Sequence, residues 1–314
     1  MKALIIGAAG FVGGHLINHL CSINNIEAFA TKLKAEQLNN DCLNKENVFD
    51  LDICDSIQVK AVLNGIKPDY IFHLAAQSSV SLSWKEPALT YNINVIGTIN
   101  ILEAIRVLEL APRILVIGSA EEYGRVEPSD LPINENVPIR PSNPYAVSKA
   151  SQEAVARLYL HAYNIDIVMV RAFNHIGPGQ STAFAIPDFA KQIVDIVNKR
   201  KEPVLYTGNL GVKRDFTDVR DIVEGYWKLV QKGRTGEVYN IGSGKSYNIK
   251  ELVHMMIKLS GENIEVKTVP DKYRLVDIPE LVADIRKIKS QILWEPMISI
   301  EQSIKDILFW WGSV

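Results

Sequence analysis

Short apolar runs alternate with longer segments of helical periodicity through the first half of this chain. The pattern predicts strands, by their length and β-branched residues, over 3–6, 27–31, 70–74, 113–117 and 165–170. It predicts helices over 10–21, 92–108 and 145–162. Runs that are apolar on both faces and separated by helices are typical of a parallel sheet covered on both sides. The predicted fold class is therefore α/β, with a doubly wound parallel sheet.

After Arg171 the regular alternation breaks down. Glycines and prolines interrupt the pattern, as in Gly177-Pro178-Gly179, and further prolines follow towards the end of the chain. We expect a smaller α+β region built on the rim of the sheet. The boundaries that we predict are 1–172 with 216–243 for the sheet domain and 173–215 with 244–314 for the smaller one.

Composition supports a folded chain and limits its partners. At 314 residues, with 47% hydrophobic and 22% charged residues, the chain is long and apolar enough for about two domains. Its 34 Lys and Arg against 36 Asp and Glu give a net charge of −2. This balance argues against nucleic acid or an anionic membrane as the main partner, although it leaves room for a small basic pocket.

The three cysteines are widely spaced and form no C-x-x-C motif. We therefore expect no disulfide framework, no zinc site and no other metal site, and a cytoplasmic location. The apolar run at the N-terminus is too short for a signal peptide, and no run has the length of a membrane span.

A glycine-rich loop follows the first predicted strand and opens the first predicted helix. It reads Gly7-Ala8-Ala9-Gly10-Phe11-Val12-Gly13. Glycines allow a tight turn and let backbone N–H groups approach a pyrophosphate, which the positive end of the helix also attracts. The strand–loop–helix context favours a dinucleotide site over a merely tight turn.

The end of the second predicted strand points to the type of dinucleotide. An NAD site usually carries an acid there, on the 2′-hydroxyl of the ribose. This chain has Lys32 and Lys34 instead. A cation suits a 2′-phosphate, so we expect NADP(H); NAD(H) stays open because both lysines can simply be solvated.

The most informative stretch is Ser142-Asn143-Pro144-Tyr145-Ala146-Val147-Ser148-Lys149. Ser142 or Asn143 can cap a helix whose first turn accommodates Pro144. Tyr145 and Lys149 then lie on one helical face. We expect the ammonium to lower the pKa of the phenol, so that Tyr145 can exchange a proton with a substrate oxygen. Without the other motifs, a tyrosine and a lysine at this spacing can also be an ordinary pair of exposed residues.

A third polar group is expected where the strand over 113–117 ends. Ser119 follows that strand, and ligands bind at the carboxyl ends of parallel strands. Its hydroxyl can hydrogen-bond a reacting oxygen. Glu121 lies two residues further on, and its carboxylate is a second candidate for acid–base work.

Taken together, these motifs resemble the extended short-chain dehydrogenase/reductase family over nearly the whole chain. The resemblance implies a Rossmann-type NAD(P)-binding domain and a nucleotide-sugar-binding domain. It matches Asp52-Ile53 to the pair that meets adenine, Leu74-Ala75-Ala76 to the loop after the fourth strand, and Asn94 to the asparagine that supports the active-site helix and its lysine. Phe173 is added to this cofactor set, and His73 is expected to pack beneath the loop rather than to act in catalysis.

The second half of the chain resembles nucleotide-sugar-binding members of this family. The stretch from Arg171 to Gln180 matches the segment that crosses to the sugar-nucleotide site. Arg214 matches a diphosphate-binding arginine, and we expect further cations to converge with it on the diphosphate. The substrate set implied by the resemblance is Ser79, Ser119, Glu121, Asn174, Lys191, Arg214, Arg274 and Asp277.

Within the family, the residues look like those of enzymes that reduce GDP-4-keto-6-deoxy-D-mannose. The implied reaction transfers hydride from NAD(P)H to C4 while Tyr145 donates a proton, giving GDP-D-rhamnose. Glu121 keeps a GDP-mannose 4,6-dehydratase open as an alternative, and a nucleotide-sugar epimerase is another. A non-catalytic NADPH-binding sensor is disfavoured because Ser119, Tyr145 and Lys149 are all present.

The predicted helices over 92–108 and 145–162 carry apolar residues beyond a single stripe. In related enzymes these helices form a four-helix interface, so the resemblance implies a homodimer. Burial of the same residues within one chain is the alternative.

Overall fold

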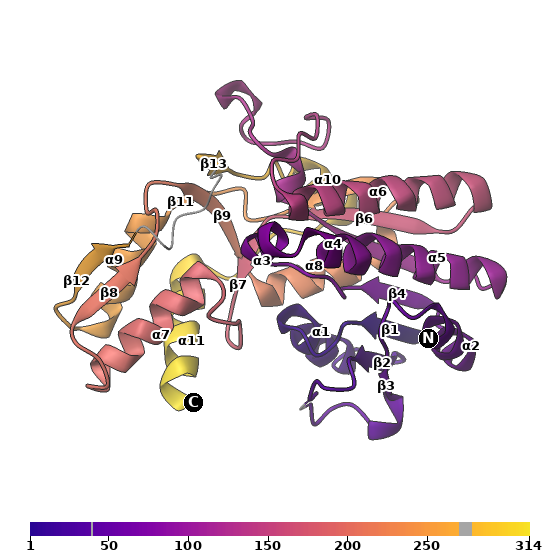
Figure 1. Cartoon of the computed structure of the whole chain (residues 1–314), viewed down its shortest axis with the longest axis horizontal. Coiled ribbons are helices and arrows are strands. Elements are labelled where there is room, and N and C mark those ends of the chain that lie inside the picture. Colours follow the sequence, from indigo (N-terminus) through magenta and orange to yellow (C-terminus); the bar gives the residue numbers. More distant parts are fainter. Residues whose placement is uncertain (39, 270–277) are drawn as a thin grey trace.

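A seven-stranded parallel sheet forms the centre of the molecule (Figure 1). The computed structural model describes residues 1–38, 40–269 and 278–314. The strand order is β10-β6-β5-β4-β1-β2-β3, and every neighbouring pair is parallel. The chain thus winds outwards from β1 in both directions, as in a Rossmann-type fold. The predicted fold class is confirmed.

The elements of this part follow the expected alternation of strand and helix. The strands are β1 (Lys2–Ile6), β2 (Glu27–Lys32), β3 (Val48–Asp50), β4 (Tyr70–His73), β5 (Arg113–Ser119), β6 (Ile167–Ala172) and β10 (Val238–Ile241). The helices are α1 (Phe11–Cys21), α2 (Ser56–Ile66), α3 (Val80–Lys85), α4 (Pro87–Tyr91), α5 (Gly97–Val107), α6 (Pro144–Tyr163), α8 (Val219–Lys232) and α10 (Arg286–Ile292). Shorter helical turns are η1 (Lys45–Asn47), η2 (Asn92–Ile96, a π-helix), η3 (Ala120–Tyr123) and η4 (Pro128–Asp130).

Alternate residues of each central strand enter two separate cores. In β1, Ala3 and Ile5 belong to the core shared with α1, α8 and α10, whereas Leu4 and Ile6 belong to the core beneath α2, α5 and α6. All four side chains are at most 1% exposed. This follows from the pleat, since successive side chains point to opposite faces, and it explains why the runs read as continuously apolar.

Smaller sheets and helices form the other part of the molecule, at the left in Figure 1. One sheet joins β11, β9 and β13, with β7 also paired to β9; a second joins β12 to β8. The strands are β7 (Asn174–Ile176), β8 (Val204–Thr207), β9 (Lys213–Asp218), β11 (Ser246–Asn248), β12 (Glu265–Thr268) and β13 (Glu280–Leu281). The helices α7 (Ala185–Val197), α9 (Ile249–Ser260) and α11 (Ile300–Ser313) share a core of their own with these strands.

The chain passes between the two parts several times. After β7 to β9 it returns to the large sheet with α8 and β10, crosses over again, and comes back with α10, whose Ile288 and Ile292 lie in the core of the large sheet. The domain boundaries given above stay a proposal, and α10 is the element that they group with the smaller part.

Within the described ranges, none of the helices combines the length and the apolar character that a membrane span requires. Cys21, Cys42 and Cys54 are all free thiols.

Candidate active site

The glycine loop is shaped by close contacts with the sheet. Gly7 has a φ of +90°, and a Cβ there would lie 2.6 Å from the backbone of Ala75. A Cβ on Gly13 would lie 2.6 Å from the backbone of Ala8. Gly10, by contrast, has only the carbonyl oxygen of Gly7, at 3.4 Å, near the position of its missing side chain. Gly7 and Gly13 are therefore required because the backbone packs closely against them, whereas Gly10 leaves space in front of the loop.

The start of α1 fits a bound phosphate. Gly10 is the N-cap residue of α1, and no side chain of the described residues caps this end. The first N–H groups of a helix lack partners within the helix and carry its positive dipole end. Together with the open mouth at Gly10, this arrangement fits the pyrophosphate of a nicotinamide dinucleotide, held by the backbone of Phe11, Val12 and Gly13.

The edge of β2 differs from the expectation for Lys32. Its Nζ lies 2.6 Å from Oδ1 of Asp50, which the sheet register places directly beside it at the end of β3. No strand is predicted from the sequence over 48–50, so the position of Asp50 at this edge is a finding of the structure. A lysine was expected here without a partner; in the structure it is paired with a half-exposed carboxylate.

Asp52 and Ile53, the pair expected to meet adenine, and the loop after β4 both lie where a dinucleotide-binding site could include them. Ile53 is buried against Gly97, where a Cβ would come within 2.4 Å of its Cδ1, and Asp52 accepts a hydrogen bond from the N–H of Cys54. The N–H groups of Leu74 and Ala75 both donate to the carbonyl of Ile6, which holds this loop beside the glycine loop.

His73 and Asn94 are both buried beneath the loop. The Nε2 of His73 lies 2.8 Å from Oγ1 of Thr98, and burial lowers the pKa of His73 to about 3, so the ring is neutral and structural. Asn94 donates to the carbonyl of Gln77 and to Oγ of Ser148, the residue before Lys149. Asn94 therefore supports the active-site helix, as expected, through Ser148.

Ser119 and Tyr145 meet at the carboxyl end of the sheet. Ser119 ends β5, and Tyr145 stands in the first turn of α6, whose N-cap Asn143 accepts a hydrogen bond from the N–H of Ala146. The Ser119 hydroxyl lies close enough to the Tyr145 phenol to act on its pKa, and each residue is at most 9% exposed. The proline at the start of the helix and its asparagine cap account for the position of Tyr145.

The expectation that Lys149 lowers the pKa of Tyr145 is wrong for this structure. Burial and the nearby carboxylates of Glu121 and Glu122 raise the pKa of Tyr145, and Lys149 does not offset them. The Nζ of Lys149 instead donates to the carbonyl of Ile117 at 2.7 Å and to Oε1 of Gln152 at 2.9 Å. Burial lowers the pKa of Lys149 to about 8.

Glu121 is fixed at the mouth of the site. Its Oε2 accepts a hydrogen bond of 3.0 Å from Asn143, and its backbone N–H donates to Oγ of Ser119 at 3.2 Å. One short turn, η3, therefore joins the expected hydroxyl, the expected carboxylate and the cap of the helix that carries Tyr145.

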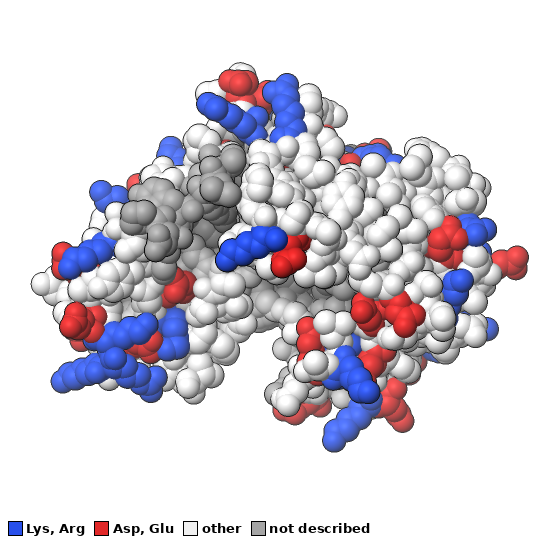
Figure 2. Space-filling model, viewed as in Figure 1, with Lys and Arg blue, Asp and Glu red and all other residues white. Residues whose placement is uncertain are grey.

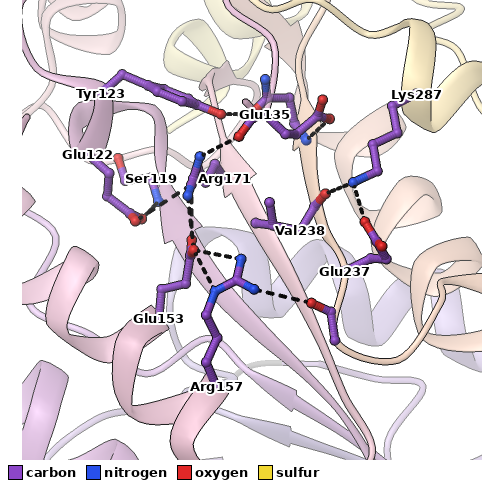
Figure 3. Close-up of polar contacts among 12 residues, drawn as sticks. Ser119, Glu122, Tyr123, Glu135, Glu153, Arg157, Arg171, Glu237, Val238 and Lys287 are labelled. Carbon is purple, nitrogen blue, oxygen red and sulfur yellow. Dashed lines mark hydrogen bonds and ion pairs between the residues drawn. The ribbon is translucent and has the colours of Figure 1, made fainter. Parts of the chain in front are cut away.

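A buried ionic network lies directly below this turn, as Figure 3 shows. Arg171, on β6, donates two hydrogen bonds of 2.9 Å to the carboxylate of Glu153, on α6. The same guanidinium lies 3.8 Å from Glu122 and 4.8 Å from the ring centre of Tyr123. Sequence reasoning missed Glu122, although Ser119 and Glu122 have the spacing of a capping box, which the structure contains.

The predicted substrate residues are only partly brought together. Asn174 is exposed at the start of β7, and Ser79 caps α3 through the N–H of Leu82. Arg214 is buried and donates to the carbonyls of Lys213 and Ile278. Arg274 and Asp277 lie outside the described residues.

Lys191 and Phe173 are placed differently from the expectation. The Nζ of Lys191 lies 2.6 Å from Asp195 and over the ring of Trp311, on α11. Its described contacts therefore lie within the helices of the smaller part, and none is with Arg214. Phe173 is 2% exposed and packs in a core with Tyr123 beneath the site.

One contact joins the cofactor loop to the segment that carries Asn174. The ring of Phe11 stacks on His175 with 6.2 Å between centroids, and Nε2 of His15 lies 2.9 Å from the carbonyl oxygen of Pro178. The start of α1 thus supports the strand that leads from the large sheet to the smaller part. No cluster of potential metal ligands occurs among the described residues.

Known proteins share both the sequence and the fold of this chain. The family model described as GDP-mannose 4,6 dehydratase matches residues 4–307. The GDP-6-deoxy-D-mannose reductase of Pseudomonas aeruginosa is 32% identical over 312 residues, which cover 99% of this chain and 97% of that protein. These matches extend well beyond the motifs from which the resemblance was first inferred.

Two solved structures agree with this. That of RMD from Pseudomonas aeruginosa complexed with NADPH has a TM-score of 0.88 and 30% identity, and covers 100% of this chain and 99% of that one. That of the Thermus thermophilus UDP-glucose 4-epimerase complexed with NAD has a TM-score of 0.89 and 26% identity, and covers 100% of both chains. The chain belongs to the GDP-mannose 4,6-dehydratase family of extended short-chain dehydrogenases/reductases, and is an NAD(P)-dependent enzyme of the nucleotide-sugar class.

Proposed function

We propose that this enzyme reduces the C4 keto group of GDP-4-keto-6-deoxy-D-mannose with NAD(P)H, giving GDP-D-rhamnose. The observation that carries the proposal is the meeting of Ser119 and Tyr145 at the carboxyl end of the sheet, in a chain that is 32% identical to a GDP-6-deoxy-D-mannose reductase over 99% of its length. Burial and the two neighbouring carboxylates raise the pKa of Tyr145, so the phenol is protonated at neutral pH, as an ordinary tyrosine is. A protonated phenol beside the Ser119 hydroxyl can donate the proton that reduction of a ketone requires.

Each residue of the site has a role in this proposal. Ser119 donates a hydrogen bond that orients the keto oxygen, and Tyr145 donates a proton to that oxygen as negative charge develops on it. Lys149 bonds the nicotinamide ribose and places positive charge near the phenol. The bound nicotinamide supplies the hydride. Asn174 and Arg214 are proposed to hold the sugar nucleotide, with Arg214 on the diphosphate.

A GDP-mannose 4,6-dehydratase is the second candidate, and Glu121 is the observation that favours it. Its carboxylate lies near Tyr145 and is oriented by Asn143, as a base for the C5 proton would have to be. Dehydration begins with oxidation at C4, however, and oxidation requires the phenol to accept a proton. The same tyrosine serves either direction, so the two candidates differ in the substrate that each turns over.

A pair of parallel assays tests the proposal. The enzyme is given GDP-mannose without a reductant and, separately, GDP-4-keto-6-deoxy-D-mannose with NADPH or NADH. We expect nicotinamide absorbance to be lost only in the second assay. Keto-sugar formed in the first would support the dehydratase instead. Turnover restricted to UDP- or dTDP-sugars would overturn the guanine assignment and favour an epimerase or another member of the family.

We further propose that NADP(H) is favoured, because Lys32 lies where a 2′-phosphate would bind. The pairing with Asp50 weakens this preference, since that carboxylate competes with a phosphate for the same cation. NAD(H) therefore remains the alternative cofactor. The cytoplasmic location expected from the three free thiols stays a prediction.

The chain is also proposed to form a homodimer through a four-helix bundle. Figure 2 shows that the face over α4, α5 and α6 carries few charged side chains. Several large apolar residues are exposed on these helices and the turn between α4 and α5: Leu89, Tyr91, Ile96, Val147 and Leu158, at 38–67%. Packing of these side chains against a second copy would bury them.

A further inference from the structure

Glu122 is a buried carboxylic acid with no assigned task. It is 0% exposed, and its Oε1 accepts a hydrogen bond of 2.7 Å from the backbone N–H of Ser119. A Cβ on Gly118 would lie 2.4 Å from the same oxygen, so the carboxyl rests directly on the end of β5. Glu122 therefore sets the position of the backbone from which the Ser119 hydroxyl extends.

The other oxygen of the Glu122 carboxyl takes no part in capping the turn. Its Oε2 is buried and has no hydrogen-bond partner among the described residues. The nearest cation, Nε of Arg171, is 3.8 Å away and already donates to Glu153. Burying a carboxyl oxygen without a hydrogen-bond partner is unfavourable. Such a cost is usual where the charge has a function.

The charged and titratable groups that face Glu122 come from two neighbouring elements. These are Tyr145, Lys149 and Glu153 of α6, and Arg171 of β6. Burial and Glu153 raise the pKa of Glu122 to about 8, while Arg171 and Lys149 act in the opposite direction. In turn, the ionised carboxylate raises the pKa of Lys149 and of Tyr145.

We propose that Glu122 is a positioning residue: it holds Ser119 in place and, once ionised, keeps the ammonium on Lys149 and the proton on Tyr145 as the pH rises. The sign follows from the charges. Below about pH 8 Glu122 is neutral and adds no charge beside Lys149 and Tyr145. Above that, the negative charge that forms on Glu122 opposes the loss of both protons. The proposal rests on the proposed function for the role of Tyr145 as proton donor.

Glu122→Gln tests this inference because the amide keeps the acceptor for Ser119 but cannot ionise. We expect kcat/KM for the keto sugar to stay within about twofold of the wild-type value near pH 6.5. The alkaline limb of its pH profile should move down by about one unit, so that activity near pH 9 falls about tenfold. Glu262→Gln, an exposed acid beyond α9, is the matched control and should leave the profile unchanged.

A second readout needs no sugar substrate. Since Lys149 is proposed to bond the nicotinamide ribose, NADPH affinity, measured by fluorescence, should weaken at lower pH in Glu122→Gln than in the wild type. This arm decides the inference even if the keto sugar is not turned over, an outcome that would refute only the proposed function. Glu122→Asp keeps the charge on a shorter side chain, and should lower kcat at every pH without moving the alkaline limb.

Three results would overturn the inference. One is an alkaline limb that coincides in the wild type and Glu122→Gln in both assays. Another is an equal loss of activity at every pH, which would mean that Glu122 acts on structure alone. The third is unfolding of Glu122→Gln near pH 6.5, because the neutral acid that the amide mimics must be compatible with the fold there.

Discussion

Tyr145 and Lys149, the two side chains of the Y-x-x-x-K motif, share a helical face, yet they do not act on each other as their spacing suggests. Spacing predicts which residues neighbour one another along α6, but not where a long side chain ends. The ammonium of Lys149 donates to the carbonyl of Ile117 and to Gln152, whereas the phenol of Tyr145 lies beside Ser119. Burial then dominates both pKa values.

Tyr145→Phe removes the proton donor while keeping the ring in place. We expect kcat to fall about 10²- to 10⁴-fold, the range typical of a lost general acid, while the Kd of NADPH changes little. Tyr163→Phe is a matched control, since this tyrosine ends the same helix and is half exposed. Full activity in Tyr145→Phe would refute the role of Tyr145 as the proton donor.

Asp50→Asn tests the edge of the cofactor site. Without the carboxylate, Lys32 is free to pair with a 2′-phosphate, so the ratio of kcat/KM for NADPH to that for NADH should rise about fivefold, the ~1 kcal/mol typical of an exposed charge pair. Glu46→Gln removes an exposed acid of η1 nearby and should leave the ratio unchanged. An unchanged ratio in Asp50→Asn would place the 2′-phosphate elsewhere.

At the scale of elements, the regular strands and helices of the first half could be predicted because each buries a long apolar pattern. The expected strand over 113–117 is part of β5, and the expected helix over 145–162 lies within α6. β3 could not be predicted, because it has only three residues and none is fully buried. The expected helix over 92–108 begins as a π-helix at Asn92, where Asn94 turns inwards to Gln77 and Ser148.

Two adjacent glycines in α1 give a prediction at this scale. Gly13→Ala would press a Cβ against the backbone of Ala8, so we expect the free energy of unfolding to fall by about 1–3 kcal/mol. Gly14→Ala meets nothing within 4 Å and should instead stabilise the helix by about 0.5–1 kcal/mol. Urea unfolding of both variants measures the difference, and equal effects would contradict the packing described for the loop.

For the whole molecule, motif spacing predicted the site at the sheet edge better than the site for the sugar nucleotide. The glycine loop, Ser119 and Tyr145 depend on local turns and on strand ends that a parallel sheet aligns. The convergence of Lys191 and Arg214 depends on how helix α7 and strand β9 pack, which no local pattern encodes. In the structure Lys191 is paired with Asp195.

The proposed homodimer can be tested by a substitution that introduces one charge into its interface. Leu158 is 67% exposed on α6, and we expect Leu158→Glu to convert a dimer into a monomer in light scattering, because a carboxylate would be buried against its copy. Leu293→Glu, at an equally exposed leucine outside these helices, serves as the control. A monomeric wild-type protein would contradict the proposed dimer.

An isotope label reports the direction and the position of hydride transfer in the proposed reaction. The enzyme is supplied with GDP-4-keto-6-deoxy-D-mannose and NADPH that carries deuterium at C4 of the nicotinamide, and the product is examined by NMR. We expect GDP-D-rhamnose with deuterium at C4 of the sugar. A sugar without the label, or with the opposite configuration at C4, would contradict the proposed reaction.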